Sequence, residues 1–131
     1  MKQRTLTLIL LLFLSPFAFA EDSETADMVE YVPLNPDFVV NLKGDQRSYL
    51  RTNIELMVKG KEHADRIRMH MPVLRHAVLM LISEYSADQL ESSEQREEFR
   101  KKAFHETKTA LEKYASSEGL SDLFFTSFLV Q

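Results

Sequence analysis

Cysteine is absent from this chain of 131 residues, while glycine occurs three times and proline four times. Without cysteine the chain can form no disulfide, has no cysteine nucleophile and carries no lipid anchor attached to a cysteine. The hydrophobic core must therefore stabilise the fold without help from disulfides. The sequence also lacks the G-x-S-x-G, H-E-x-x-H and phosphate-loop motifs. We therefore predict a protein that is not an enzyme.

Acidic residues outnumber basic ones, with 20 Asp and Glu against 16 Lys and Arg, which gives a net charge of −4. This acidic balance argues against nucleic acid as a partner. Among the four histidines, His70 and His76 flank Pro72 instead of lying four residues apart on one helix. The other two are His63 and His105. Because a metal site needs converging ligands, we interpret all four as surface or helix-end side chains and expect no cofactor.

The first 20 residues have the three parts of a secretory signal peptide. Lys2 and Arg4 form a positive n-region, residues 6–17 are almost wholly apolar, and Ala18 and Ala20 give an A-x-A cleavage site. We predict cleavage after Ala20. Removing 20 residues from 131 leaves 111, and removing two positive charges from a net charge of −4 leaves −6. The alternative is a short uncleaved membrane anchor.

In either case the body of the protein is exported, because the positive end of the segment stays inside. An exported chain without cysteine suggests the bacterial periplasm. Residues 21–30 are acidic and poor in apolar side chains, which predicts a flexible leader. Residues 31–131 have the length of one domain.

Two strands are predicted at the start of this domain. Residues 31–36 contain two prolines, which favour an extended or edge segment. Phe38–Leu42 is rich in β-branched and aromatic residues, as strands are. Arg47–Val58 alternates between apolar and polar side chains, which predicts a long half-buried strand. The connection at residues 43–46 has turn residues and is short, so the two strands should form an antiparallel hairpin.

Helices should fill the middle of the chain. The central one lies in Met71–Leu90, where Pro72 suits a first turn and Leu79 and Met80 widen an apolar stripe. A modest amphipathic helix at residues 61–71 precedes it. Two S-x-x-Q capping boxes follow, one at Ser86 and one at Ser92. The second opens a helix that should run to about residue 117 with an inward stripe of Phe99, Ala103, Thr107, Ala110, Leu111 and Tyr114, before Gly119 stops it.

The closing segment, Leu120–Gln131, reads as a strand with large apolar residues on both faces. Strict alternation puts Leu123, Phe125 and Leu129 on one face and Phe124, Phe128 and Val130 on the other. Such a strand is either central in the sheet or covered on one face by another subunit. The predicted order is β-β-α-α-α-α-β. This is an α+β fold, with helices on one face of a small sheet that contains antiparallel strands.

Five residues are candidates for a partner or oligomer interface. Arg66, Arg68 and Arg75 form a basic patch in an otherwise acidic protein, which is either a solvated face or a docking surface for an acidic partner. Phe124 and Phe128 of the closing strand are either core side chains or apolar residues that a partner covers.

Several segments together resemble the periplasmic domain of FliL, the flagellar basal-body-associated protein. They are Tyr31–Leu34 with Phe38–Leu42, then Ser48–Arg51 leading into the long strand, the apolar helix of Pro72–Leu90, and the end Leu123–Gln131, which is similar to a closing F-T-x-F-V-V-Q signature. Each motif is weak alone, but their order and spacing make the set fairly specific. The resemblance covers residues 31–131.

The resemblance implies a fold similar to the stomatin-type (SPFH) domain and a non-enzymatic role in the flagellar motor. Proteins of this family assemble into rings around the stator, beside the periplasmic part of the MotB-type subunit, and support torque or swarming. It also implies a periplasmic location at the basal body, with inner-membrane attachment if the N-terminal segment is retained. That short segment departs from the family pattern and leaves open a secreted FliL-like paralogue. The alternative function is a soluble periplasmic binding or chaperone-like module that captures extended segments at a sheet edge.

Overall fold

Residues 28–45 and 47–131 are described by the structure, which is a computed structural model. Their elements are β1 (Val29–Pro33), β2 (Phe38–Asn41), β3 (Tyr49–Lys59), α1 (Lys61–Met69), α2 (Met71–Ser83), the 3₁₀ helix η1 (Ala87–Leu90), α3 (Ser93–Glu112) and β4 (Leu120–Val130). The predicted signal peptide, with Ala18 and Ala20, lies outside the described residues. The α+β class is confirmed.

The sheet is antiparallel, and the long strand β3 pairs along both of its edges. The strands β1 and β2 follow one another along one edge, so that Tyr31 lies opposite Met57 and Val39 opposite Arg51. β4 pairs with the other edge over its whole length. The predicted hairpin of β2 and β3 is confirmed. β1 begins at Val29, two residues inside the segment predicted as a flexible leader.

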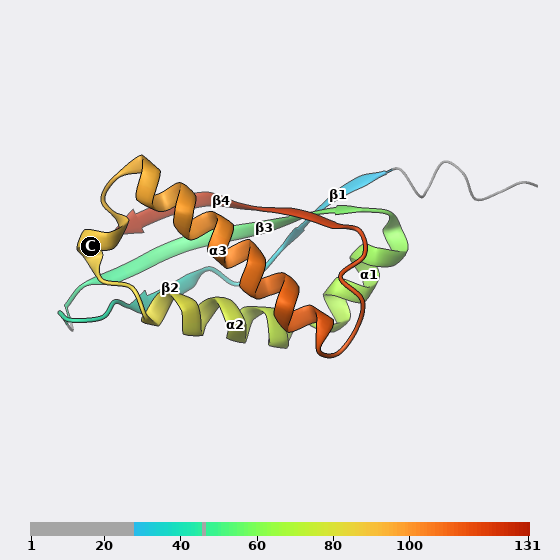
Figure 1. Ribbon diagram of the computed structural model, residues 1–131, viewed down its shortest axis with the longest axis horizontal. Coiled ribbons are helices and arrows are strands. Elements are labelled where there is room, and N and C mark those ends of the chain that lie inside the picture. The colour runs from blue at the N-terminus through green and yellow to red at the C-terminus, as the bar shows by residue number, and fades with distance from the viewer. Residues whose placement is uncertain (1–27, 46) are drawn as a thin grey trace, which may run out of the picture.

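One face of the sheet is covered by helices and the other is open. On β3 the alternation follows the sequence pattern, since Leu50, Thr52, Ile54, Leu56 and Val58 are all buried. Figure 1 shows α2 and α3 lying side by side across this face, while α1 lies at the end of the sheet where β3 leads into it. Among the described residues, none of the helices is long and apolar enough to cross a membrane.

Both predicted capping boxes are present, at Ser86 and at Ser92. At Ser92 the serine hydroxyl accepts from the N–H of Gln95 and the Gln95 side chain accepts from the N–H of Ser92. At Ser86 the side chain of Gln89 accepts from the N–H of Ser86.

The prediction for the outer side of α2 is wrong. Leu79 and Met80 are 43% and 48% exposed, so they do not widen the buried stripe. Only one side of α2 faces the core, through Leu74, Val78, Leu81 and Ile82.

The end of α3 is also corrected. The helix stops at Glu112, well before Gly119, and Tyr114 is 65% exposed instead of completing the inward stripe. Gly119 has a positive φ of 84° at the start of β4. A Cβ atom built there would lie 2.6 Å from both the Cβ of His63 and the carbonyl oxygen of Lys59. The glycine is therefore required where β4 passes the start of α1, and it does not terminate the helix.

β4 is an edge strand and not a central one. Its two apolar faces are explained by a register shift, because Asn53 pairs with Ser127 while the next residue, Ile54, pairs with Phe125. Thr126 is thus the extra residue of a β-bulge, which reverses the alternation on one side of it. The strand therefore places Leu120, Leu123, Phe125, Phe128 and Val130 opposite the inward-facing residues of β3.

Candidate functional site

A groove of about 280 Å³ lies between the first half of α3 and the edge strand β4. We call it the β4–α3 groove, and its lining residues are Ser93, Arg96, Glu97 and Arg100 from α3 with Phe124, Phe125 and Phe128 from β4. It brings together the two aromatic residues that the sequence predicted as interface, Phe124 and Phe128. An apolar floor with charged walls is typical of protein-binding surfaces.

Two arginine–aromatic contacts form the walls of this groove. Arg96 and Arg100 are four residues apart, so they project from the same side of α3. The guanidinium of Arg96 lies 5.1 Å from the ring centroid of Phe128, and that of Arg100 lies 5.7 Å from the centroid of Phe124. Both distances lie within the range of a cation–π interaction. The two pairs hold the aromatic side chains against the helix.

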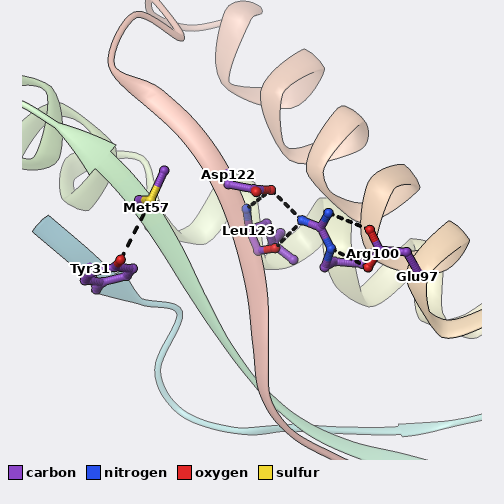
Figure 2. Close-up of polar contacts among 6 residues, drawn as sticks. All are labelled: Tyr31, Met57, Glu97, Arg100, Asp122 and Leu123. Atoms are coloured by element: carbon purple, nitrogen blue, oxygen red, sulfur yellow. Dashed lines mark hydrogen bonds and ion pairs between the residues drawn. The ribbon is translucent and has the colours of Figure 1, made fainter. Parts of the chain in front are cut away.

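Arg100 is fixed by two carboxylates and one carbonyl. It donates to Glu97 at 2.8 Å, to Asp122 on β4 and to the carbonyl oxygen of Leu123 at 2.9 Å. Figure 2 shows the guanidinium between these groups, joining α3 to β4. Hydrogen bonding to Glu97 and then to Asp122 raises the pKa of Arg100, and the same bond from Arg100 lowers the pKa of Glu97. This arginine is therefore part of the scaffold.

Arg96 is less engaged than Arg100. Its Nε donates to the carbonyl oxygen of Leu90 at 2.8 Å, which orients the side chain. Among the ion pairs of the described residues, none involves Arg96. A guanidinium has five N–H donors. Arg96 therefore leaves a positive charge and further donors at the wall of the groove.

The floor of the groove is a packed aromatic cluster. Phe99 is fully buried, and its ring centroid lies 5.4 Å from that of Phe125 and 6.2 Å from that of Phe128. Tyr85 packs edge-on against Phe99, with ring centroids 4.7 Å apart. Contacts of this kind add to the stability gained from burial. The floor is consequently part of the core, and Phe128 is both a core residue and a surface of the groove.

The three predicted arginines lie elsewhere and are bound within the chain. Arg66 contacts the imidazole Nδ1 of His63 at 2.8 Å, and Arg68 pairs with Glu30 of β1 at 2.6 Å. Arg75 donates to the carbonyl oxygens of Leu34 and Pro36 and covers the ring of Phe38. The contacts of Arg68 and Arg75 join separate elements, whereas that of Arg66 lies within α1. A docking role for them stays a prediction.

Neither the groove nor its surroundings gathers a set of metal-binding side chains. Within residues 28–45 and 47–131, no three His, Asp or Glu side chains come close enough to hold a metal ion together. His70 lies between α1 and α2, and His105 is an exposed residue of α3. The arrangement supports recognition through apolar contact and charge.

The open face of the sheet is a second exposed surface. It carries Tyr31, Val39 and Leu129, which are each exposed by about half or more. Figure 2 also shows the Tyr31 hydroxyl directed at the sulfur of Met57, at 3.8 Å, across β1 and β3.

Arg96 and Arg100 were not predicted from the sequence as interface residues. A signal does exist, because two arginines spaced by four on α3 match two phenylalanines spaced by four on β4. That signal is incomplete, because the groove also needs Phe125 on the same face as Phe128. Strict alternation puts these two residues on opposite faces, and only the bulge at Thr126 brings them together.

Two comparisons with known proteins identify relatives of this chain. The sequence profile of the family described as "Flagellar basal body-associated protein FliL" matches residues 31–131. A "Flagellar protein FliL" from Aquifex aeolicus (strain VF5) is 28% identical over 99 residues, which cover 75% of this chain and 59% of that protein. The match thus spans somewhat more than half the length of this relative. The region matched by the family profile contains β2, β3, β4 and the helices described between β3 and β4.

Proposed function

Because this chain belongs to the family of flagellar basal body-associated FliL proteins, we propose that it is a non-enzymatic accessory protein of the flagellar motor. In this proposal it lies in the periplasm beside the stator, contacts the MotB-type subunit and supports torque, motility or swarming. Copies of the chain assemble around the stator. The α+β fold is compatible with the stomatin-type domain that the sequence resemblance implies.

The observation that carries this proposal is the β4–α3 groove. It combines the partly exposed Phe124, the aromatic floor that includes Phe128 and the charge of Arg96 on one side of the domain. A surface of this composition binds another protein more readily than it binds a small polar metabolite. An accessory protein of a large assembly needs such a surface.

The experiment removes the gene and restores it with variants. Deletion should reduce swarming on soft agar and the torque of tethered cells, and the unaltered chain should restore both. Phe124→Asp should fold and be exported but fail to restore motility, because a charge would enter the apolar groove. Met80→Asp is the matched control, since Met80 is exposed on α2 outside the groove. Normal swarming and torque after deletion would refute the motor role.

The second candidate is the soluble periplasmic binding or chaperone-like module. The unpaired edge of β4 favours it, because a sheet edge can capture an extended segment. Such a module would be monomeric and would act on many exported proteins. Self-association of the purified chain together with a defect confined to motility would separate the motor accessory from this alternative.

A further inference from the structure

The outer edge of β4 is open for hydrogen bonding. Within the described part of the chain, β4 pairs with β3 alone, and its 11 residues include neither proline nor lysine. Natural edge strands are usually blunted by such residues, by shortness, by a cover or by β-bulges, and the register shifts of β4 leave only its end, residues 127–131, free of a bulge and next to the groove. The opposite edge of the sheet differs, because Pro33 and Pro36 interrupt it between β1 and β2. β4 is therefore the edge that can accept another strand.

The backbone groups that point outward can be assigned from the register. Tyr49 and Gln131 exchange two backbone hydrogen bonds, at 2.7 and 2.9 Å. Antiparallel pairs alternate between hydrogen-bonded and non-hydrogen-bonded. Hence Phe128 and Val130, which lie opposite Thr52 and Leu50, direct their N–H and C=O groups away from β3. The bulge at Thr126 confines this regular edge to residues 127–131.

The side chains of an added strand would follow from the same geometry. Residues directly opposite one another in an antiparallel pair place their side chains on one face of the sheet. A residue opposite Phe128 would therefore extend toward α3, on the side where the β4–α3 groove lies. A neighbour two positions along the added strand would lie on the same face. It would come near the guanidinium of Arg96, which covers the ring of Phe128.

We infer that the outer edge of β4 binds an extended segment of a partner protein as an added strand. That segment has an apolar residue that enters the β4–α3 groove and an acidic residue two positions away that pairs with Arg96. The inference rests on the proposed function, since it names the chemistry by which the motor partner is recognised. Charge complementarity selects this occupant, because the groove holds a positive charge that no carboxylate of the described residues neutralises.

The first variant tests the backbone. Val130→Pro removes an N–H that β3 does not use, so the fold should survive, as proline is tolerated on edge strands. Val130→Ala is the matched control, because it trims the side chain and keeps the N–H. Binding of a partner strand should weaken about tenfold or more in Val130→Pro relative to Val130→Ala. Equal binding by the two variants would overturn the inference.

The probe is a fluorescein-labelled synthetic peptide, Thr-Val-Asp-Val-Leu-Val-Thr. It is titrated with the full-length protein purified from cells in its processed form. Its leucine and aspartate lie on one face in extended form. The unaltered chain should bind it about tenfold more tightly than a peptide with lysine in place of aspartate. Arg96→Glu should reverse this preference. If Val130→Pro does not fold, the Arg96→Glu variant still tests the inference. An Arg96→Glu chain that prefers the aspartate peptide as strongly as the unaltered chain does would overturn the inference.

Two further outcomes are distinguishable. The purified chain could form dimers through this edge. If Val130→Pro makes these dimers dissociate while the added peptide does not, a second copy of the chain occupies the edge and the inferred partner is wrong. In cells, Val130→Pro should swarm less than Val130→Ala. If deletion of the gene impairs swarming but the two variants swarm equally, the strand-addition inference fails and the motor role stands. If deletion has no effect while the peptide binds as expected, the motor role fails and the edge site stands.

Discussion

Phe125 and Phe128 lie on the same face of β4, with ring centroids 5.1 Å apart and planes at 72°. Three positions separate them in the sequence, so a regular strand would place them on opposite faces. The bulge at Thr126 brings them together against Phe99. This relationship turns an apparently two-faced strand into a floor for the β4–α3 groove, and it leaves Phe124 as the aromatic residue at the outer rim.

We expect Phe128→Asp and Phe124→Asp to differ in stability. Phe128 belongs to the aromatic cluster, so an aspartate there should lower the free energy of unfolding by roughly 2 to 4 kcal/mol. Phe124 lies opposite the outward-facing Glu55, and its replacement should cost about 1 kcal/mol or less. Urea unfolding of both variants measures the difference. Equal losses would show that the bulge does not separate the two residues as described.

Leu81→Ala should destabilise the domain by about 2 to 5 kcal/mol, as other large-to-small changes in a core do. Leu81 is buried on the inner side of α2. Leu79→Ala is the control on the same helix, because Leu79 faces solvent, and it should change stability by about 0.5 kcal/mol or less. The urea midpoints of the two variants report this contrast. A wild-type midpoint for Leu81→Ala would show that α2 is packed by a different side.

Gly119→Ala should cost more than Gly44→Ala. Both glycines have positive φ angles, of 84° and 98°, so both substitutions carry the backbone penalty of about 1 kcal/mol or more. At Gly44 a Cβ atom would meet nothing within 4 Å, whereas at Gly119 it would meet His63 and the carbonyl of Lys59. The difference between the melting temperatures of the two variants measures the steric part of the cost at Gly119. Similar melting temperatures would mean that α1 can move away from β4 at no cost.

The stability contributed by Glu97 should depend on pH. Its hydrogen bond with Arg100 holds the carboxyl pKa below the ordinary value of 4.5. A pKa lowered on folding gives a contribution that is present above 4.5 and is lost as the pH falls through the folded value. Glu97→Gln should therefore be less stable than the unaltered chain at pH 7, and the difference should shrink in acid. Unfolding midpoints over a pH series measure this, with Glu98→Gln as the control.

A difference between Glu97→Gln and the unaltered chain that stays constant with pH would assign the contribution to packing instead of charge. Glu98 suits the control because it neighbours Glu97 on α3 and belongs to none of the ion pairs found among the described residues. Its variant should show little change at any pH in the series.

Cleavage of the signal peptide after Ala20 remains a prediction. It rests on the positive residues Lys2 and Arg4, the apolar stretch and the A-x-A site. Sequencing the N-terminus of periplasmic material should give Glu21 as the first residue. Recovery of a membrane-bound form that begins at Met1 would support the uncleaved anchor.

The sequence determined by itself those features that depend on neighbouring residues. The alternation of β3, the short turn before it and the two capping boxes at Ser86 and Ser92 each follow from local geometry, and all of them are present. The family resemblance likewise rested on motifs readable in order along the chain, and the match over residues 31–131 confirms it.

Tertiary structure alone decided the face on which each phenylalanine of β4 lies, the end of α3 and the bonding of the arginines. A bulge arises only from pairing with β3, so alternation within β4 cannot reveal it. Gly119 is fixed by the close approach of His63, which is distant in sequence. Arg75 and Arg100 meet carbonyls and carboxylates contributed by other elements. Because these contacts form between residues far apart in the sequence, local sequence patterns do not predict them.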